Sequence, residues 1–367
     1  MGDHSVIKSN SSVRWTCAIA FIVFAFLWLY RFQSDVLAAA QHVLSGGKTT
    51  YSPLLGAVLI TALLLALQLL IWTVLRLRGR GHALTYFPSM LVLALISAIN
   101  TDVSQSYAWG FWWLLVPLVL ISWVGICMVV RYIQNVEPDK DTDVFFSRPM
   151  WINMLVMFLM MVGVAAVGNT NAVFHYRMRA ETCLLKGDYE GALEAGSESL
   201  ESDVQLQMIR MYAMALRGEL GERLFHYPVV GNSSTMLPTS SEARFVRYPT
   251  DRIKLSKTML RDYELCGLLI DRRLDDFVTR LQRYYAFGDS LDTNHLPKHY
   301  REALTLYNHS RHHPVLVYHN PVMEEDYRNL QELERQYSDI TERQGKVEDL
   351  YGDTYWYYYK YPAITSP

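Results

Sequence analysis

A glycine-rich loop is the first place where residue type and spacing could support chemistry. Residues 45–49 read Ser-Gly-Gly-Lys-Thr, which is the end of a phosphate-binding P-loop. In that motif the glycines let backbone N–H groups surround the phosphates, and the lysine contacts the terminal ones. The pattern also requires a glycine at position 42, where this chain has His42. The fragment therefore does not predict nucleotide binding.

A histidine-rich stretch is the second candidate, as a metal site. Six of the 11 histidines fall between positions 295 and 319. They are His295, His299, His309, His312, His313 and His319. A metal site needs histidines at fixed spacing with a carboxylate partner. Pro297 and Pro314 interrupt this stretch, and it lacks a His-Glu-x-x-His motif. Histidines at loops and helix ends are the favoured interpretation, with metal binding as the alternative.

The chain has 4 cysteines, and two of them could form a disulfide. Cys17 and Cys127 lie in apolar stretches, whereas Cys183 and Cys266 lie in the polar half. The latter two belong to different predicted helix pairs with another pair between them, so two buried thiols are favoured over a bond.

Sequence motifs for other common chemistries are missing. The chain contains no Gly-x-Ser-x-Gly, Gly-x-Gly-x-x-Gly or Cys-x-x-Cys. The sequence therefore predicts no cofactor. It assigns no catalytic, cofactor-binding or metal-binding residue, and it leaves the partner-binding residues unassigned.

Composition divides the 367 residues into two unlike parts. Residues 1–167 carry 17 charged side chains, and residues 168–367 carry 53. The first part is too apolar for a soluble domain, while the second has an ordinary globular composition. The formal net charge of -2 provides no basic footprint for nucleic acid. A wholly cytosolic enzyme is excluded, and we expect two domains, 1–167 in the membrane and 168–367 in water.

Five apolar stretches fill the first domain and predict five transmembrane helices, because a spanning helix needs about 20 mostly apolar residues. The three shorter stretches need flanking residues to complete the span. Their polar side chains are few and include no buried charge, which disfavours a transporter. The stretches are 15–30, 53–75, 83–99, 109–130 and 151–167.

The distribution of Lys and Arg between the loops predicts orientation. Eight lie on one side, and the other side carries only Arg31 and Lys48. The basic side faces the cytoplasm in most membrane proteins. We therefore expect a cytoplasmic N-terminus and, after an odd number of spans, a periplasmic second domain on a bacterial inner membrane. The first span is interpreted as a retained signal-anchor, since no small-residue cleavage site follows it. The eight are Lys8, Arg14, Arg76, Arg78, Arg80, Arg131, Lys140 and Arg148.

The second domain has the pattern of helix pairs. Residues 180–193 resemble the turn and second helix of a tetratricopeptide repeat, in which a small residue such as Ala192 lets two helices cross closely. A degenerate copy follows 31 residues later, measured from Gly187 to Gly218, and a weaker third has its turn at 271–272. A generic helical bundle is the alternative. The fold class is therefore predicted as all-α, with a helical-repeat domain after the spans.

Two segments interrupt this helical pattern. Residues 228–251 are rich in Ser, Thr, Pro and Gly, and are expected to form a long exposed loop. The end of the chain places seven aromatic residues between Tyr351 and Tyr361. We expect these rings to cap the last helix pair, because the end of a repeat array exposes an apolar face. Contact with lipid headgroups is the alternative.

Several strings resemble an uncharacterised family of bacterial multi-pass membrane proteins. The resemblance implies N-terminal spans followed by a tetratricopeptide-like tail, and it implies no activity or catalytic residue. The strings are Ala-Gln-His-Val-Leu-Ser-Gly-Gly at 40–47, His-Ala-Leu-Thr-Tyr-Phe-Pro-Ser at 82–89, Leu-Gly-Glu-Arg-Leu-Phe-His at 220–226, Leu-Pro-x-x-Tyr-Arg-Glu-Ala-Leu at 296–304 and Gly-Asp-Thr-Tyr-Trp-Tyr-Tyr at 352–358.

Taken together, these features predict a membrane-anchored interaction or scaffold protein of the bacterial envelope. Membrane lipid and a protein or peptide bound by the repeat domain are the expected partners, and nucleic acid is not. The alternative is a component of an envelope enzyme or transport system, with a site between the spans and the tail. A pocket with converging titratable groups would favour that alternative.

Overall fold

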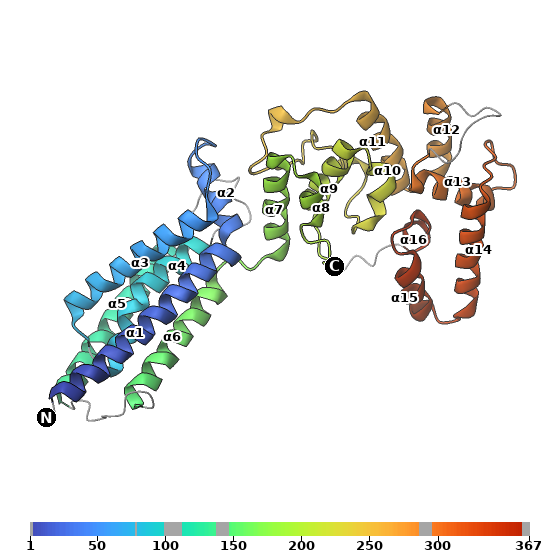
Figure 1. Ribbon diagram of the computed structural model, residues 1–367. Coiled ribbons are helices and arrows are strands. Elements are labelled where there is room, and N and C mark those ends of the chain that lie inside the picture. The colour runs from blue at the N-terminus through green and yellow to red at the C-terminus, as the bar shows by residue number, and fades with distance from the viewer. Residues whose placement is uncertain (1–2, 78, 99–111, 137–146, 286–295, 362–367) are drawn as a thin grey trace. The chain divides into compact units, whose positions relative to one another are not determined.

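The computed structural model describes residues 3–77, 79–98, 112–136, 147–285 and 296–361, and these residues form helices without β-strands. The chain divides into two compact units, Met1–Asn171 and Ala172–Pro367 (Figure 1). Some sequence predictions fall outside the described residues. They are the loop at 100–108, the aromatic residues at 107 and 109, the basic residues at 78 and 140, and the histidine at 295.

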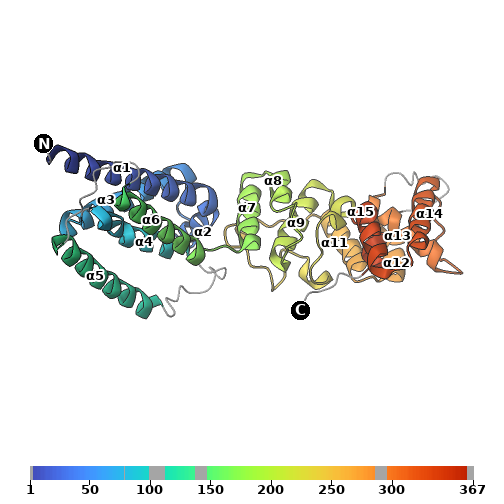
Figure 2. The same cartoon turned by 90° about the horizontal axis from the view of Figure 1, so that it is seen from below.

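Unit 1 is a bundle of long helices with short connecting elements. Figures 1 and 2 show α1, α3, α4 and α6 lying lengthwise beside one another. The elements are α1 (Asp3–Leu27), the π-helical turn η1 (Trp28–Phe32), α2 (Ser34–Leu44), α3 (Pro53–Leu75), the 3₁₀-helix η2 (Gly79–Tyr86), α4 (Phe87–Ser97), α5 (Trp112–Val136) and α6 (Arg148–Val167).

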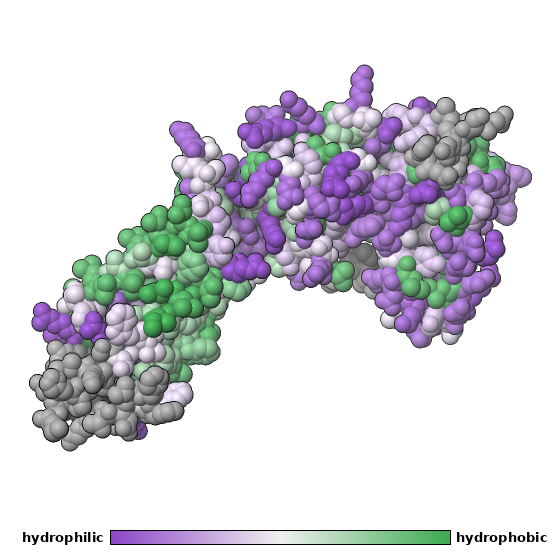
Figure 3. Space-filling view, in the orientation of Figure 1, coloured by the Kyte–Doolittle hydropathy of each residue, from purple (hydrophilic) through white to green (hydrophobic). Residues whose placement is uncertain are grey.

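Four of these helices are long and apolar enough to cross a membrane. They cover Ser12–Phe32, Pro53–Leu75, Trp112–Gln134 and Arg148–Val167. Their outward faces carry exposed apolar side chains such as Leu63, Ile121 and Leu159. In Figure 3 apolar residues cover the middle of the unit 1 helices on the face shown. The chain therefore has the helices of a membrane protein.

The predicted span at 83–99 has a different structure. Its first residues belong to the 3₁₀-helix Gly79–Tyr86, and only Phe87–Ser97 is α-helical. Pro88 stands in the first turn of that helix, where its missing N–H is tolerated. An 11-residue helix is about 16 Å long, against about 30 Å of hydrocarbon. The fifth spanning helix is therefore not confirmed.

A polar cluster joins the C-terminal ends of three helices in unit 1. The Trp28 indole N–H donates to the Ser97 hydroxyl at 2.9 Å, and the backbone N–H of Asn169 donates to the Ser97 carbonyl at 2.8 Å. The Gln33 amide donates to the Asn169 carbonyl at 3.0 Å. The ends of α1, α4 and α6 therefore lie together. Trp28 is buried inside the bundle.

A second polar cluster joins the opposite ends. The Asn153 amide on α6 donates to the Gly79 carbonyl at 2.8 Å and accepts from the Ala83 N–H at 2.6 Å. The guanidinium of Arg14, early in α1, lies 4.1 Å from the ring of Trp72, late in α3. Because α1, α4 and α6 start near this cluster and end at the other, the chain enters and leaves the bundle at opposite ends.

Unit 2 consists of successive helix pairs. The members are α7 (Ala172–Lys186), α8 (Tyr189–Glu194), α9 (Val204–Arg217), α10 (Leu220–Arg223), the 3₁₀-helices η3 (Leu224–His226), η4 (Ser233–Thr235) and η5 (Thr250–Arg252), α11 (Lys257–Ile270), α12 (Leu274–Tyr284), α13 (Lys298–Ser310), α14 (Pro321–Gln336), α15 (Ile340–Tyr351) and α16 (Tyr355–Lys360). Neighbouring helices share one continuous apolar core (Figure 2).

The turns within the first three pairs each contain a residue with positive φ. Gly187 and Gly218 follow the first helices with φ of 75° and 74°, a region in which only glycine avoids a steric penalty. Arg272 takes the corresponding place in the third pair with φ of 56°. Ala192 is fully buried on α8, which contacts both α7 and α9. The small residue therefore lies at a helix crossing, as predicted.

The aromatic end of the chain folds back onto unit 2. Tyr355 and Trp356 are 0% and 1% exposed, and the Trp356 indole N–H donates to the Glu302 carbonyl at 2.7 Å. The Trp356 ring packs 5.2 Å from that of Tyr327 on α14. These two rings are therefore buried against α13 and α14.

Removing the Trp356 indole tests this cap. We expect Trp356→Ala to lower the free energy of unfolding of a 172–367 fragment by about 3–5 kcal/mol, because it deletes a buried aromatic side chain. Leu350→Ala is the control, since that side chain is 68% exposed and its loss should cost less than about 0.5 kcal/mol. Urea unfolding followed by circular dichroism measures both. Equal effects of the two substitutions would contradict the cap.

Candidate functional site: a strap across the first helices

The segment that joins η3 to α11 covers one face of unit 2. We call residues 228–256 the strap, and the face made by α7, α9 and α11 the first-helix face. The strap was expected to be an exposed loop, but side chains of all three helices hold it (Figure 1). The expectation was wrong because composition reveals the polar residues of the strap but not the helix side chains that bind them.

A buried carboxylate holds the strap on α7. Glu181 is 0% exposed and accepts three consecutive backbone N–H groups, from Val246 at 3.0 Å, Arg247 at 2.6 Å and Tyr248 at 3.2 Å. The Arg177 guanidinium, one helical turn earlier, lies 4.0 Å from the same carboxylate. Burial raises the pKa of Glu181, although the three N–H groups and Arg177 act in the opposite direction.

Amide side chains of α9 bind the strap in the same manner. Gln205 donates to the Glu242 carbonyl at 2.7 Å and accepts from the Arg244 N–H at 2.8 Å. The Gln207 amide oxygen accepts from the Val230 N–H. These bonds involve the main chain of the strap and are thus independent of its side chains.

The end of α11 holds the start of the strap. The Asp271 carboxylate accepts from the Ser233 N–H at 3.0 Å and from its hydroxyl at 2.5 Å. Gly267 leaves room for this contact, because a Cβ there would stand 3.1 Å from that of Ser233. Met236 is buried beside it, and a hollow of about 260 Å³ remains between the strap and α11.

Side chains add selectivity to this main-chain binding. The Arg247 guanidinium donates to the Thr182 hydroxyl on α7. The ring of Tyr248 packs edge-to-face on that of Tyr212, with 6.0 Å between centroids. The first-helix face therefore binds a segment that is bent at 246–248 and presents a basic residue next to an aromatic one.

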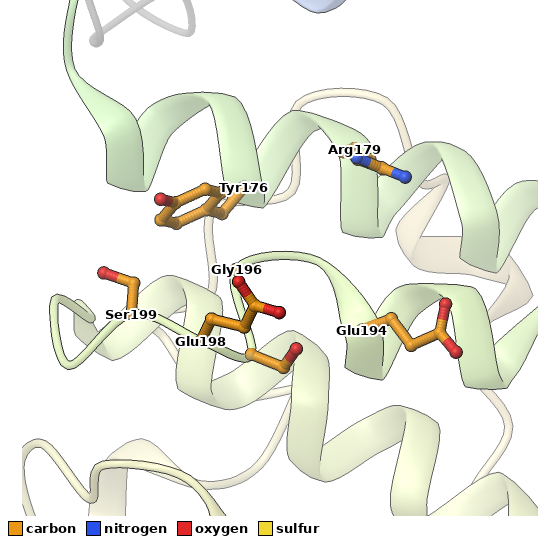
Figure 4. Close-up of a pocket in the computed structure, with 7 residues that line it drawn as sticks. Tyr176, Arg179, Glu194, Gly196, Glu198 and Ser199 are labelled. Atoms are coloured by element: carbon orange, nitrogen blue, oxygen red, sulfur yellow. The ribbon is translucent and has the colours of Figure 1, made fainter.

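A second hollow opens beside α7, away from the strap contacts. Figure 4 shows Tyr176 and Arg179 on one side, and Glu194, Glu198 and Ser199 on the other. Its volume is about 700 Å³, and it is wide open to solvent. Such an open, charged hollow is unlike the enclosed apolar clefts that bind small molecules.

The densest group of titratable side chains lies between α13 and the last helix. His299 is fully buried, and its Nδ1 lies 2.8 Å from Glu302, which accepts the Tyr355 N–H at 2.7 Å. Lys298 donates to Asp353 at 2.8 Å, and His226 lies 3.4 Å from the same carboxylate. This arrangement holds the start of α16 against α13.

Two groups in this cluster have displaced pKa values. Burial lowers the pKa of His226, with Asp353 acting in the opposite direction. Burial also acts to raise the pKa of Asp353, but the hydrogen bond and charge of Lys298 outweigh it, and the net direction is down. The lowered pKa of Asp353 favours its ionised form paired with Lys298, whereas the lowered pKa of His226 favours the neutral imidazole.

The residues that the sequence singled out do not come together. Gly46 and Gly47 have positive φ and terminate α2, which explains the glycines of the P-loop fragment. Cys266 lies 3.6 Å from the Tyr300 hydroxyl, and no disulfide joins it to Cys183. Within the described residues, no three metal-ligating side chains are grouped. The histidines of the stretch 296–319 have different surroundings. His299 is buried, His309 lies beside Tyr327, His319 lies beside Glu324, and His312 and His313 are exposed.

The binding residues of the first-helix face were missed. Arg177 and Glu181 are four residues apart on a predicted helix, which also fits an ordinary surface ion pair. Gln205, Gln207 and Asp271 carry no signal in a single sequence. Only the return of the strap to α7 gives these five side chains a common role.

One protein family matches part of the chain. Residues 254–362 match a family described as "Family of unknown function (DUF6057)". This segment spans α11 to α16 and includes Glu302 and the aromatic cap. No curated protein and no solved structure matches the chain.

Protonation of Glu181 gives a test of its burial. Since the folded-state pKa is raised, the folded domain binds this proton more tightly than the unfolded chain does. The resulting stabilisation is complete below the ordinary carboxyl pKa of about 4.3 and is lost as pH rises through the raised value. The free energy of unfolding of wild type minus that of Glu181→Gln should therefore fall as pH rises above about 4 and through the raised pKa.

Denaturant unfolding of residues 172–367 across this pH range measures that difference. Glu242→Gln is the matched control, because the Glu242 side chain is exposed on the strap itself. A difference that stays constant for Glu181→Gln, as expected for the control, would refute the burial effect.

Proposed function

We propose that this protein is a membrane-anchored scaffold whose helix-pair domain binds a non-helical segment of a protein partner. One observation carries the proposal: the first-helix face already binds a non-helical segment through main-chain hydrogen bonds to Glu181, Gln205 and Gln207. The contacts with Glu181 suit a segment that is bent as residues 246–248 are, and the neighbouring side-chain contacts supply preference.

The helix pairs of unit 2 are proposed to be degenerate tetratricopeptide-like repeats. Supporting this are the positive-φ turns at Gly187, Gly218 and Arg272, and the buried Ala192 at a helix crossing. In repeat proteins, corresponding helices line one extended surface that binds partners. The strap contacts α7, α9 and α11, which are the corresponding first helices of three pairs.

Unit 1 is proposed to be the anchor in a bacterial inner membrane, with the N-terminus in the cytoplasm and unit 2 in the periplasm. The distribution of Lys and Arg supports this orientation. The entry and exit of the chain at opposite ends of the bundle support it as well, whether or not α4 counts as a span. Exposed apolar side chains on the four long helices are suited to lipid.

Reporter fusions test the orientation. Alkaline phosphatase joined after residue 200 should be active, because it folds only outside the cytoplasm. Green fluorescent protein at the same point should be dark after export, and bright when joined at the N-terminus. The opposite pattern would contradict the topology.

Partner capture tests the function. The tagged full chain would be crosslinked in its native membrane, and the proteins recovered would be compared between wild type and Gln205→Ala. The substitution removes two main-chain hydrogen bonds, so recovery of a partner bound at this face should fall about tenfold. Gln282→Ala, an exposed glutamine on the second helix α12, is the control and should not change recovery. Equal recovery from all three chains would argue against this face as the binding site.

A further inference from the structure

We propose that the strap is an internal occupant of the first-helix face, and that the partner displaces it with a non-helical segment that takes the same bend and carries adjacent basic and aromatic residues. This inference rests on the proposed function and specifies its partner and regulation. The segment of the strap that the partner would replace is 242–248.

The length and path of the strap are the first support. From Pro228 to Ser256 it has 29 residues, although α10 and α11 contact each other directly. The turn within the first pair needs only Gly187 and Asp188. Loops beyond about 12–15 residues are uncommon in compact domains and are usually functional. The strap instead contacts α11 through Ser233, returns to α7, and comes back to begin α11.

The second support is the type of contact. Between residues 242 and 248, the face donates to two carbonyls and accepts four N–H groups. The donors are Gln205 and Arg177, and the acceptors are Gln205 and Glu181. A partner segment that takes the same bend at 246–248 presents the same groups, so exchange of one segment for another retains every main-chain bond.

Glu181 makes loss of the strap unfavourable when no other segment replaces it, but allows one bound segment to be exchanged for another. Its carboxylate is 0% exposed and accepts three N–H groups of the strap, and leaving a buried carboxylate without donors is costly. When the strap leaves, water hydrates the carboxylate. When a partner arrives, three new N–H groups replace those of 246–248. The Glu181 carboxylate is therefore bonded to backbone N–H groups both when the strap is bound and when the partner is bound.

The side chains of the strap define the chemistry of the partner. Arg247 bonds to Thr182, Tyr248 packs on Tyr212, and Phe245 is half-buried against the core. A proline in the position of Arg247 is excluded, because Glu181 needs the N–H at that position. Because the strap is tethered, its effective concentration at the face is on the order of millimolar, and a free segment must compete with it.

Hydrogen exchange on the intact wild-type protein in detergent tests whether the strap opens. The amides of Val246, Arg247 and Tyr248 should exchange through local opening, at least about tenfold faster than those of Ala303 and Leu304 in the buried middle of α13. Equal rates in the two segments would mean that the strap leaves only on global unfolding, and the proposal would be overturned.

Binding of a labelled peptide tests displacement. The peptide carries residues 240–250, and the protein is the full chain with either Arg247 or Arg247→Pro, which removes the N–H bonded to Glu181. We expect fluorescence anisotropy to show at least about tenfold tighter binding to the Arg247→Pro chain. N-methylation of the peptide at Arg247 should weaken that binding about tenfold, while N-methylation at Phe245, which donates to none of the face side chains, should not.

The outcomes separate the two proposals. No binding, equal binding to both chains, or equal binding of the two methylated peptides would overturn the strap as an occupant, even if partner capture still depends on Gln205. Binding as expected without any captured partner would leave the occupant standing and would count against the scaffold function. If Arg247→Pro fails to fold, the exchange rates of the wild-type protein decide the inference.

Discussion

A buried carboxylate needs hydrogen-bond donors, and this constraint organises unit 2. Glu181 and Glu302 are 0% and 1% exposed, and each stands on the first helix of a pair. Glu181 accepts three backbone N–H groups and Glu302 accepts one, in each case from a segment that lies far away in sequence. Charge-assisted hydrogen bonds of this kind are about twice as strong as neutral ones. The two carboxylates therefore fix the two segments that depart from the repeating helix pairs, the strap and α16.

The same constraint acts on unit 1 with neutral groups. Exposed apolar side chains cover its long helices, so its backbone and amide groups have to find partners inside the bundle. The Asn153 amide satisfies Gly79 and Ala83, which belong to a 3₁₀-helix rather than an α-helix. Trp28 and Asn169 both bond to Ser97, the last residue of α4. The short α4 thus joins both polar clusters and sets the direction of its neighbours.

Local features of this structure could be predicted from sequence, and long-range ones could not. Apolar stretches and glycine turns depend on nearby residues, so the helical class and the turns at Gly187 and Gly218 were accessible. The 3₁₀ start of the span predicted at 83–99 depends on Asn153, 70 residues away from Ala83. The attachment of 228–251 to unit 2 depends on Glu181 and Gln205, whose carboxylate and amide look like surface groups in the sequence. The candidate site was missed because each of its contacts joins residues far apart.

Glu181 and Glu302 both bind a distant segment through its backbone N–H groups, but only one of the two segments is held permanently. The amount of apolar surface that each segment buries explains the difference. At Glu302 the captured segment places Tyr355 and Trp356 in the core, and each such ring contributes roughly 1.5–3 kcal/mol by leaving water. At Glu181 the captured segment leaves Glu242 and Arg244 exposed, and its rings are only half-buried. Local opening is easiest where few apolar contacts are lost. Apolar burial therefore makes α16 a permanent part of the fold, whereas the strap is held mainly by hydrogen bonds that water or another polypeptide can replace.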